Sequence, residues 1–193
     1  MIESKIKSII EKTKADLLSR KQIFDSSFIK VFEEKYKLPD GRIISKQSVS
    51  KNNGKEAVIV ITKTIDNKFL LVFQNRVDNV VSIEFPSGYI EDKEEITEAA
   101  KREVLEETGY LIENIKLIDT FIPNIGTESS KIYIVYGENA KKINNQELDD
   151  DEYINYYLFS YEELEYLIKK NYIQSGGNKL AFFHLKEIIK NNE

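Results

Sequence analysis

Residues Gly88–Tyr110 read GYIEDKEEITEAAKREVLEETGY, and this stretch determines how the whole chain is interpreted. Its second half places Glu103, Glu106 and Glu107 at spacings of i, i+3 and i+4, which a helix brings to one face. Like charges at these spacings destabilise a bare helix, so a positive group should lie against that face. Because carboxylates offer only oxygen ligands, the pattern indicates a hard divalent cation such as Mg²⁺. The alternative is an acidic helix face covered by water.

The residues around these glutamates have mechanical roles of their own. Gly88 permits a tight turn, so that the backbone can approach a metal ion or a phosphate closely. Glu94 can reach back to Arg102 and fix the loop to the helix by a charge-assisted contact. Apolar positions between the glutamates should face a sheet, and they are Ala100, Val104 and Leu105.

Composition restricts the class of protein. At 193 residues with 41% hydrophobic content, the chain should form one domain with a real core and room for an appended arm. The net charge of −5 argues against a general nucleic-acid partner. There is no cysteine, which excludes disulfides, thiolate zinc sites and a cysteine nucleophile. No apolar run reaches membrane-spanning length and the start lacks a secretory signal, so we expect a cytoplasmic protein without a membrane partner.

Hydrophobic periodicity predicts both helices and strands. Helices are expected over 2–18, 97–108, 160–170 and 178–190. A hairpin should turn at Asp40-Gly41, and strands should cover 57–62, 69–74, 115–122, 131–136 and 154–159. The order favours an α+β fold with a mixed β-sheet flanked by helices. We expect residues 1–54 to form an N-terminal arm of a helix and a β-hairpin, and residues 55–193 to form the main domain.

From Gly88 to Tyr110 the stretch resembles a complete Nudix box, with every fixed position matched. Membership of the Nudix hydrolases implies an α/β/α sandwich with a mixed sheet. By this resemblance, Glu103 and Glu107 are the principal metal ligands and Glu106 is a shared or outer ligand. The Ser87 carbonyl can contribute to the site. The implied cofactor is Mg²⁺, with Mn²⁺ as a possible substitute.

Three further segments resemble the ADP-ribose pyrophosphatase group of these hydrolases. They are the strand end Gln74-Asn-Arg76, the lead Glu84-Phe-Pro-Ser-Gly88 and the acidic run Asp149-Asp-Asp-Glu-Tyr-Ile154. The resemblance covers roughly residue 28 to the end. It implies a substrate-binding set of Arg76, Glu84 and Gly88, and a catalytic set of Arg102, Glu106, Glu107 and Glu152.

Each flanking assignment has a simpler alternative. Arg76 would bind a phosphate or the terminal ribose, or else form a surface ion pair. Glu84 would bind substrate or support the metal site, or else end a strand in solvent. Glu152 is the candidate general base for the attacking water, or else part of a solvated charge run. The only histidine, His184, lies in a predicted apolar helix and is expected to have a structural role.

The expected activity is Mg²⁺-dependent hydrolysis of a nucleoside diphosphate linked to another moiety, above all ADP-ribose to AMP and ribose 5-phosphate. Other expected substrates are nucleotide sugars, dinucleoside polyphosphates and nucleoside triphosphates. A non-catalytic ADP-ribose sensor is the alternative of a different class. The resemblance also implies a homodimer, in which the N-terminal arm packs against the partner; the alternative is an arm packed on its own subunit.

Overall fold

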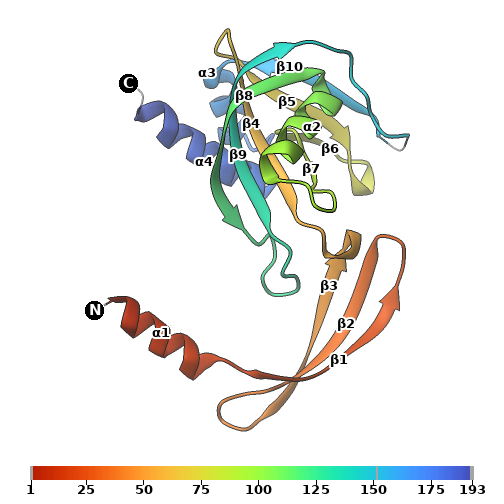
Figure 1. The fold of residues 1–193 in the computed structure, drawn as a ribbon, viewed down its shortest axis with the longest axis vertical. Coiled ribbons are helices and arrows are strands. Elements are labelled where there is room, and N and C mark those ends of the chain that lie inside the picture. Colours follow the sequence, from red (N-terminus) through yellow and green to blue (C-terminus); the bar gives the residue numbers. More distant parts are fainter. Residues whose placement is uncertain (1, 151, 192–193) are drawn as a thin grey trace. The chain divides into compact units, whose positions relative to one another are not determined.

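The computed structural model describes residues 2–150 and 152–191, so Asp151 of the acidic run lies outside the described residues. The backbone separates into two compact units (Figure 1). The smaller unit contains the residues up to Gly54 together with Asn124–Ser130. The larger unit contains Lys55–Pro123 and the residues from Lys131 onward.

The smaller unit is a three-stranded antiparallel sheet preceded by a helix. Its elements are α1 (Ile2–Thr13), β1 (Asp16–Asp25), β2 (Ile29–Lys37), β3 (Ile43–Lys51) and the short η1 (Asn52–Gly54), and its strand order is β1-β2-β3. The predicted hairpin at Asp40-Gly41 is confirmed, since it joins β2 to β3.

The predicted helix over 2–18 is wrong at its C-terminal end, because α1 stops at Thr13. Leu17 lies in β1 and pairs with Tyr36 of β2, and Arg20 pairs with Glu34. These backbone bonds to a distant strand outweigh the helical spacing of the apolar residues. The arm is therefore a helix and a three-stranded sheet rather than a helix and a hairpin.

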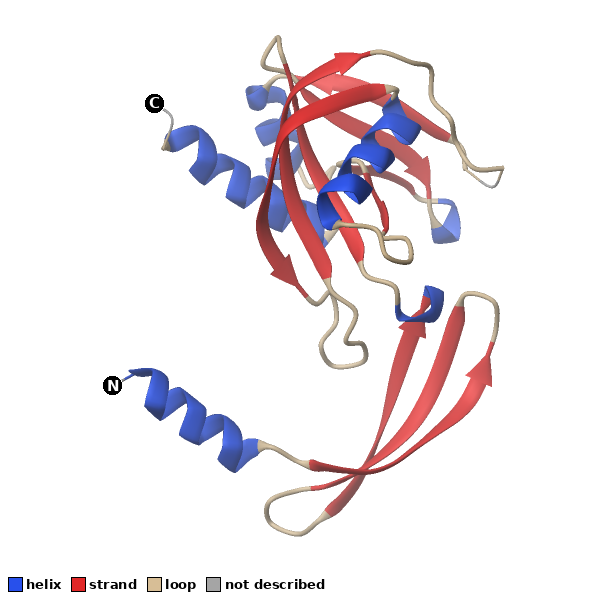
Figure 2. Cartoon of the chain, in the orientation of Figure 1, coloured by secondary structure: helices blue, strands red, loops and turns tan. Residues whose placement is uncertain are grey.

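The larger unit contains the remaining strands and helices (Figure 2). They are β4 (Ala57–Thr64), β5 (Phe69–Asn75), η2 (Val77–Asn79), β6 (Val81–Glu84), β7 (Ser87–Tyr89), α2 (Ile96–Thr108), β8 (Tyr110–Phe121), β9 (Ile132–Lys142), β10 (Ile154–Phe159), α3 (Tyr161–Lys169) and α4 (Gly176–Lys190). The sheet order is β10-β5-β4-β9-β8, with β6 added to β5 and β7 added to β4. Strands β4 and β9 run parallel and the other pairs are antiparallel, which confirms an α+β fold with a mixed sheet.

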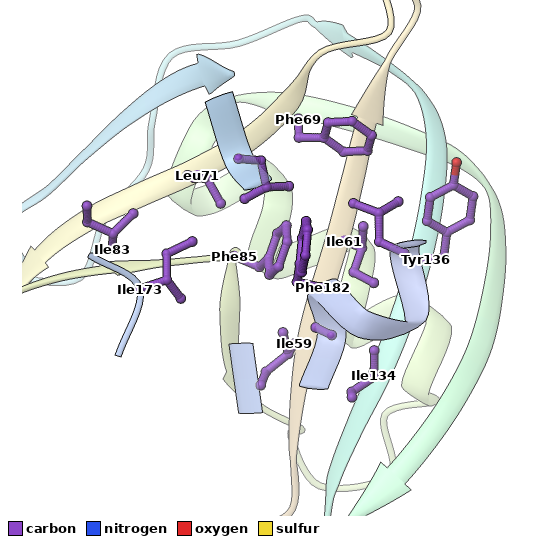
Figure 3. Packing of buried hydrophobic residues seen from close by; sticks show 13 residues of the cluster. Ile59, Ile61, Phe69, Leu71, Ile83, Phe85, Ile134, Tyr136, Ile173 and Phe182 are labelled. Carbon is purple, nitrogen blue, oxygen red and sulfur yellow. The ribbon is translucent and has the colours of Figure 1, made fainter. Parts of the chain in front are cut away.

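Strand β4 has a core on each of its faces. Val58 and Val60 pack with Ala100 and Val104 of α2 on one face. Ile59 and Ile61 point to the other face, into a cluster with Phe85 of the β6–β7 connection and residues of α3 and α4 such as Leu164 and Phe182 (Figure 3). Alternate side chains of a strand point to opposite faces, so the run of buried residues requires a layer of helix on each side. The predicted α/β/α sandwich is confirmed.

Local signals define two helix ends as predicted. Ser160 caps α3 in a capping box, since its Oγ accepts a bond from the Glu163 N–H and the Glu163 carboxylate accepts one from the Ser160 N–H. Gly109 ends α2 with a φ of 71°, in the left-handed region that favours glycine.

Replacing Gly109 by Ala should lower the free energy of unfolding by more than about 2 kcal/mol. An alanine at this position would keep an unfavourable positive φ, and its Cβ would stand 2.1 Å from the Asn144 carbonyl oxygen. The matched control is Gly176→Ala at the first residue of α4, where a Cβ meets nothing within 4 Å, and it should change stability by less than about 1 kcal/mol. Denaturant unfolding of both variants checks this, and equal effects would contradict the role given to Gly109.

Candidate active site

Helix α2 turns two of the box glutamates inward. Ala100 and Val104 are fully buried against the sheet, as predicted, whereas Leu105 is only partly buried. The neighbouring turns carry Glu103, which is 9% exposed, and Glu107, which is 2% exposed. The packing that holds the helix on the sheet therefore also removes two carboxylates from water.

Arg102 holds the box together. Its Nε and Nη2 donate to the two Glu94 carboxylate oxygens at 2.8 and 3.1 Å, which confirms the predicted contact between loop and helix. Its Nη1 donates to Glu103 at 2.7 Å and to Glu106 at 2.9 Å, and Nη2 also donates to the Tyr89 carbonyl at 2.9 Å. One guanidinium thus joins the loop, the strand β7 and two of the three glutamates.

The buried carboxyls carry more negative charge than their surroundings neutralise. Burial raises the pKa of Glu103 from its ordinary 4.5 to about 7, although Arg102 opposes this shift. Burial also raises the pKa of Glu107 well above its usual value, and the nearby Glu103 carboxylate adds to the effect. Glu94 differs, because its bonds to Arg102 lower its pKa. Ionising Glu103 and Glu107 together calls for additional positive charge beside them.

Strand β7 approaches these carboxylates closely. The Ser87 N–H donates to Glu107 Oε2 at 3.1 Å. A Cβ on Gly88 would lie 2.1 Å from the Glu103 carboxylate carbon, so only glycine leaves room for that side chain. Gly88 was expected to permit a tight turn; it lies instead in a short strand, and the group that its backbone approaches in this structure is the Glu103 carboxylate.

Arg76, one residue past the end of β5, pairs with Glu84, the last residue of β6. The Arg76 Nε and Nη2 donate to the two Glu84 oxygens at 2.9 and 2.7 Å. This bidentate pair raises the pKa of Arg76. The alternative for Arg76 was a surface ion pair. The structure shows an ion pair, but its carboxylate partner Glu84 is largely buried, at 8% exposure.

Glu152 stands in the acidic loop that leads into β10. Its N–H donates to the Asp149 carbonyl at 3.0 Å, and its Oε2 accepts a weak bond from the Asp149 N–H at 3.4 Å. Its charge contributes to the raised pKa of Glu103, of Glu107 and of Arg76. The loop therefore acts electrostatically on the same residues that α2 and β5 bring together.

Sequence reasoning missed two polar residues that support this site. Asn178, at 2% exposure on α4, accepts a bond from the Phe85 N–H at 2.7 Å and so fixes the segment between Glu84 and Ser87. Gln146 binds two carbonyl oxygens, those of Glu107 and Ile154. His184 lies in α4, and its Nε2 is 2.7 Å from an Asp119 carboxylate oxygen of β8.

Glu103 and Glu106 are bonded to Arg102, whereas Glu107 is bonded to the Ser87 N–H, so the three carboxylates do not converge on one point. Within residues 2–150 and 152–191, no three acidic, histidine or cysteine side chains form a ready metal cluster. Glu103 and Glu107 nevertheless fit a hard divalent cation, because they offer oxygen ligands that are buried and short of positive charge.

A family model of the NUDIX domain matches residues 54–177. The chain belongs to the NUDIX family. An ADP-ribose pyrophosphatase of Bacillus subtilis (strain 168) is 27% identical over 190 residues, covering 96% of this chain and 98% of that protein. A methanol dehydrogenase activator of Bacillus methanolicus is 32% identical over 178 residues, and the alignment covers 90% of this chain and 94% of that protein.

A solved structure described as an ADP compounds hydrolase has the same fold. It superposes with a TM-score of 0.84 at 21% identity and covers 93% of this chain and 96% of that one. The matched family, relatives and fold identify a Nudix pyrophosphohydrolase. No helix among the residues that the structure describes is long and apolar enough to cross a membrane.

The stability of the metal-free protein should depend on pH through Glu103. Its folded-state pKa is raised, so its contribution to stability is intact below about pH 4.5 and is lost as the pH rises through about 7. The loss should be on the order of 3 kcal/mol. Denaturant unfolding with chelator at pH 5 and pH 8 measures it as the difference between the wild type and Glu103→Gln, in which this group cannot ionise. A difference that stays constant between these pH values would contradict the assignment.

Proposed function

We propose that this Nudix hydrolase cleaves ADP-ribose to AMP and ribose 5-phosphate with Mg²⁺ as its cofactor, and that Mn²⁺ can replace Mg²⁺. The observation that carries the proposal is the burial of Glu103 and Glu107, whose joint ionisation a bound cation would favour, within an intact box. The choice of substrate is supported by the B. subtilis ADP-ribose pyrophosphatase, which aligns with nearly the full length of this chain.

In this proposal Glu103, Glu106 and Glu107 would hold the metal with the Ser87 carbonyl. The bound cation would supply charge neutralisation at the diphosphate and a lower pKa for the attacking water. The protein groups have separate tasks. Arg102 keeps Glu103 and Glu106 oriented through the bonds that it already makes. Gly88 keeps the backbone close to Glu103.

Substrate binding and proton transfer fall to residues at the ends of β5 and β6 and in the acidic loop before β10. Arg76 would bind a phosphate or the terminal ribose, and Glu84 would orient Arg76 through their bidentate contact. Glu152 would take the proton of the attacking water, a task that suits a carboxylate within electrostatic reach of Glu103 and Glu107. With a net charge of −5, the protein depends on such local positive groups to attract an anionic diphosphate.

Related substrates are the nearest alternatives. Nucleotide sugars, dinucleoside polyphosphates and nucleoside triphosphates contain the same phosphoanhydride bond. Another relative, a protein of Streptomyces rubellomurinus (strain ATCC 31215), is 28% identical over 119 residues and is described as a CMP-5'-(N-acetyl-N-hydroxy-3-aminopropyl)phosphonate hydrolase. Similar proteins are therefore described with substrates other than ADP-ribose. A non-catalytic sensor would bind ADP-ribose without consuming it.

ADP-ribose should be consumed with AMP and ribose 5-phosphate as products, only when Mg²⁺ or Mn²⁺ is present. Product analysis over ADP-ribose, NADH, nucleotide sugars and triphosphates, with metal or with chelator, measures this. Glu107→Gln should lower kcat by at least about a hundredfold, because it removes one buried charge of the metal site. The matched control is Glu98→Gln, an exposed glutamate of the same helix that pairs with Lys101, and it should leave kcat unchanged.

Faster turnover of another substrate would replace ADP-ribose in the proposal. Binding of ADP-ribose without any product would support the sensor. Full activity in chelator, or a normal kcat for Glu107→Gln, would overturn the metal role.

We further propose that the chain forms a homodimer through its N-terminal arm. Every residue of α1 and of β1 is exposed within one chain. Helix α1 aligns Ile2, Ile6, Ile9 and Ile10 along one side, the spacing of an apolar stripe that needs a partner. Strand β1 adds the exposed apolar residues Leu17, Leu18, Ile23 and Phe24.

The wild type should sediment at twice the 22.5 kDa mass of one chain. Replacing Ile6 and Ile9 by Glu should shift it toward the monomer, because two charges would then enter the apolar contact. Ser8→Glu adds a charge on the other side of α1 and should leave the dimer intact. A monomeric wild type at micromolar concentration would favour an arm that packs on its own subunit.

A further inference from the structure

The C-terminal end of α2 is held by one short segment, residues 142–147, which begins at the last residue of β9. The last carbonyls of a helix lack partners inside the helix and need them from elsewhere. Here the Glu106 carbonyl accepts the Glu147 N–H at 2.9 Å, and the Thr108 carbonyl accepts Lys142 Nζ at 2.7 Å. The Gly109 carbonyl accepts the N–H groups of residues 143 and 144.

Gln146 makes the remaining contact of this set, and it differs from the others. Its Nε2 donates to the Glu107 carbonyl at 2.6 Å and also to the Ile154 carbonyl at 3.0 Å. Ile154 begins β10, is 3% exposed and pairs with Gln74 of β5. One partly buried amide therefore joins the backbone of a proposed metal ligand to the first residue of the strand that follows the acidic loop.

This bridge closes the loop that carries Glu152. The loop begins at Gln146, whose side chain is bonded to the end of α2. It ends at Ile154, two residues after Glu152, and the Ile154 carbonyl accepts a bond from the same Gln146 side chain. Inside the loop, the Glu152 N–H donates to the Asp149 carbonyl at 3.0 Å. Fixing both ends of a short loop to one amide reduces the positions that Glu152 can occupy relative to Glu107.

We propose that Gln146 is a positioning residue, whose amide bridge holds the Glu152 loop in register with the Glu107 backbone for the hydrolytic step. This rests on the proposed function, in which Glu152 accepts the proton of the attacking water. A displacement of about 1 Å between reacting groups can cost about a hundredfold in rate. Loss of the bridge should therefore affect turnover more than substrate binding.

Gln146→Met tests the bridge, since it retains the length of the side chain but donates no hydrogen bond. It should lower kcat for the best substrate of the panel by about 10- to 100-fold and change KM by less than about threefold. Lys142→Met is the matched control, because it also removes one bond to the end of α2, and its other contacts are with the Tyr110 and Tyr156 rings rather than with the Ile154 carbonyl. It should lower the melting temperature to a similar degree while kcat stays within about threefold of the wild type.

A double-mutant cycle separates positioning from a general loss of structure. If Gln146 acts through Glu152, then Gln146→Met should slow a Glu152→Gln enzyme no further. A full additional loss in that background, or a kcat within about threefold of the wild type for Gln146→Met alone, would overturn the proposal.

A measurement without turnover keeps the test independent of the proposed function. Hydrogen exchange at the Glu152 amide should accelerate in Gln146→Met and not in Lys142→Met. Unchanged exchange would overturn the positioning role even in an active enzyme. Accelerated exchange in a protein that hydrolyses no panel substrate would support the bridge and refute the proposed activity alone.

Discussion

Helix α2 carries two buried glutamates, Glu103 and Glu107, and their burial sets the electrostatics of the site. Taking a carboxylate out of water is unfavourable unless hydrogen bonds and opposite charge compensate for it. Arg102 supplies one positive charge, and the Ser87 N–H supplies a hydrogen bond to Glu107. This compensation is incomplete, because the pKa values of Glu103 and Glu107 remain raised. A site that is short of one or more positive charges is suited to bind them.

The fold holds this helix near its middle, at Arg102, and at its C-terminal end, as well as along its apolar face. Before the helix, Glu94 and the Tyr89 carbonyl bind Arg102. After it, the segment 142–147 binds successive carbonyls from Glu106 to Gly109. Between the ends, Val104 packs into the sheet. Because each tether comes from a different strand connection, the orientation of Glu103 and Glu107 is fixed by the whole larger unit rather than by the helix alone.

The parts of the site that the sequence predicts correctly depend on residues close together in the chain. The Glu94–Arg102 contact spans eight residues, and the Ser160–Glu163 capping box spans three. The failed part of helix 2–18 shows the opposite case, since β1 owes its strand form to pairing with β2. Gln146 and Asn178 were missed for the same reason: their partners lie 39 and 93 residues away, and a lone amide residue carries no local signal of its partner.

The pairing of Arg76 with Glu84 bears on how an acidic protein can bind an anionic substrate. A guanidinium has five N–H groups, and the bidentate contact uses the Nε and Nη2 edge. The Arg76 side chain is nevertheless 47% exposed, whereas that of Glu84 is 10% exposed. Releasing Glu84 to free the arginine would leave a largely buried carboxylate without its partner, which is strongly unfavourable. In the proposed function, Arg76 would therefore bind a phosphate while Glu84 still holds it, so the ion pair and the proposed substrate role are compatible.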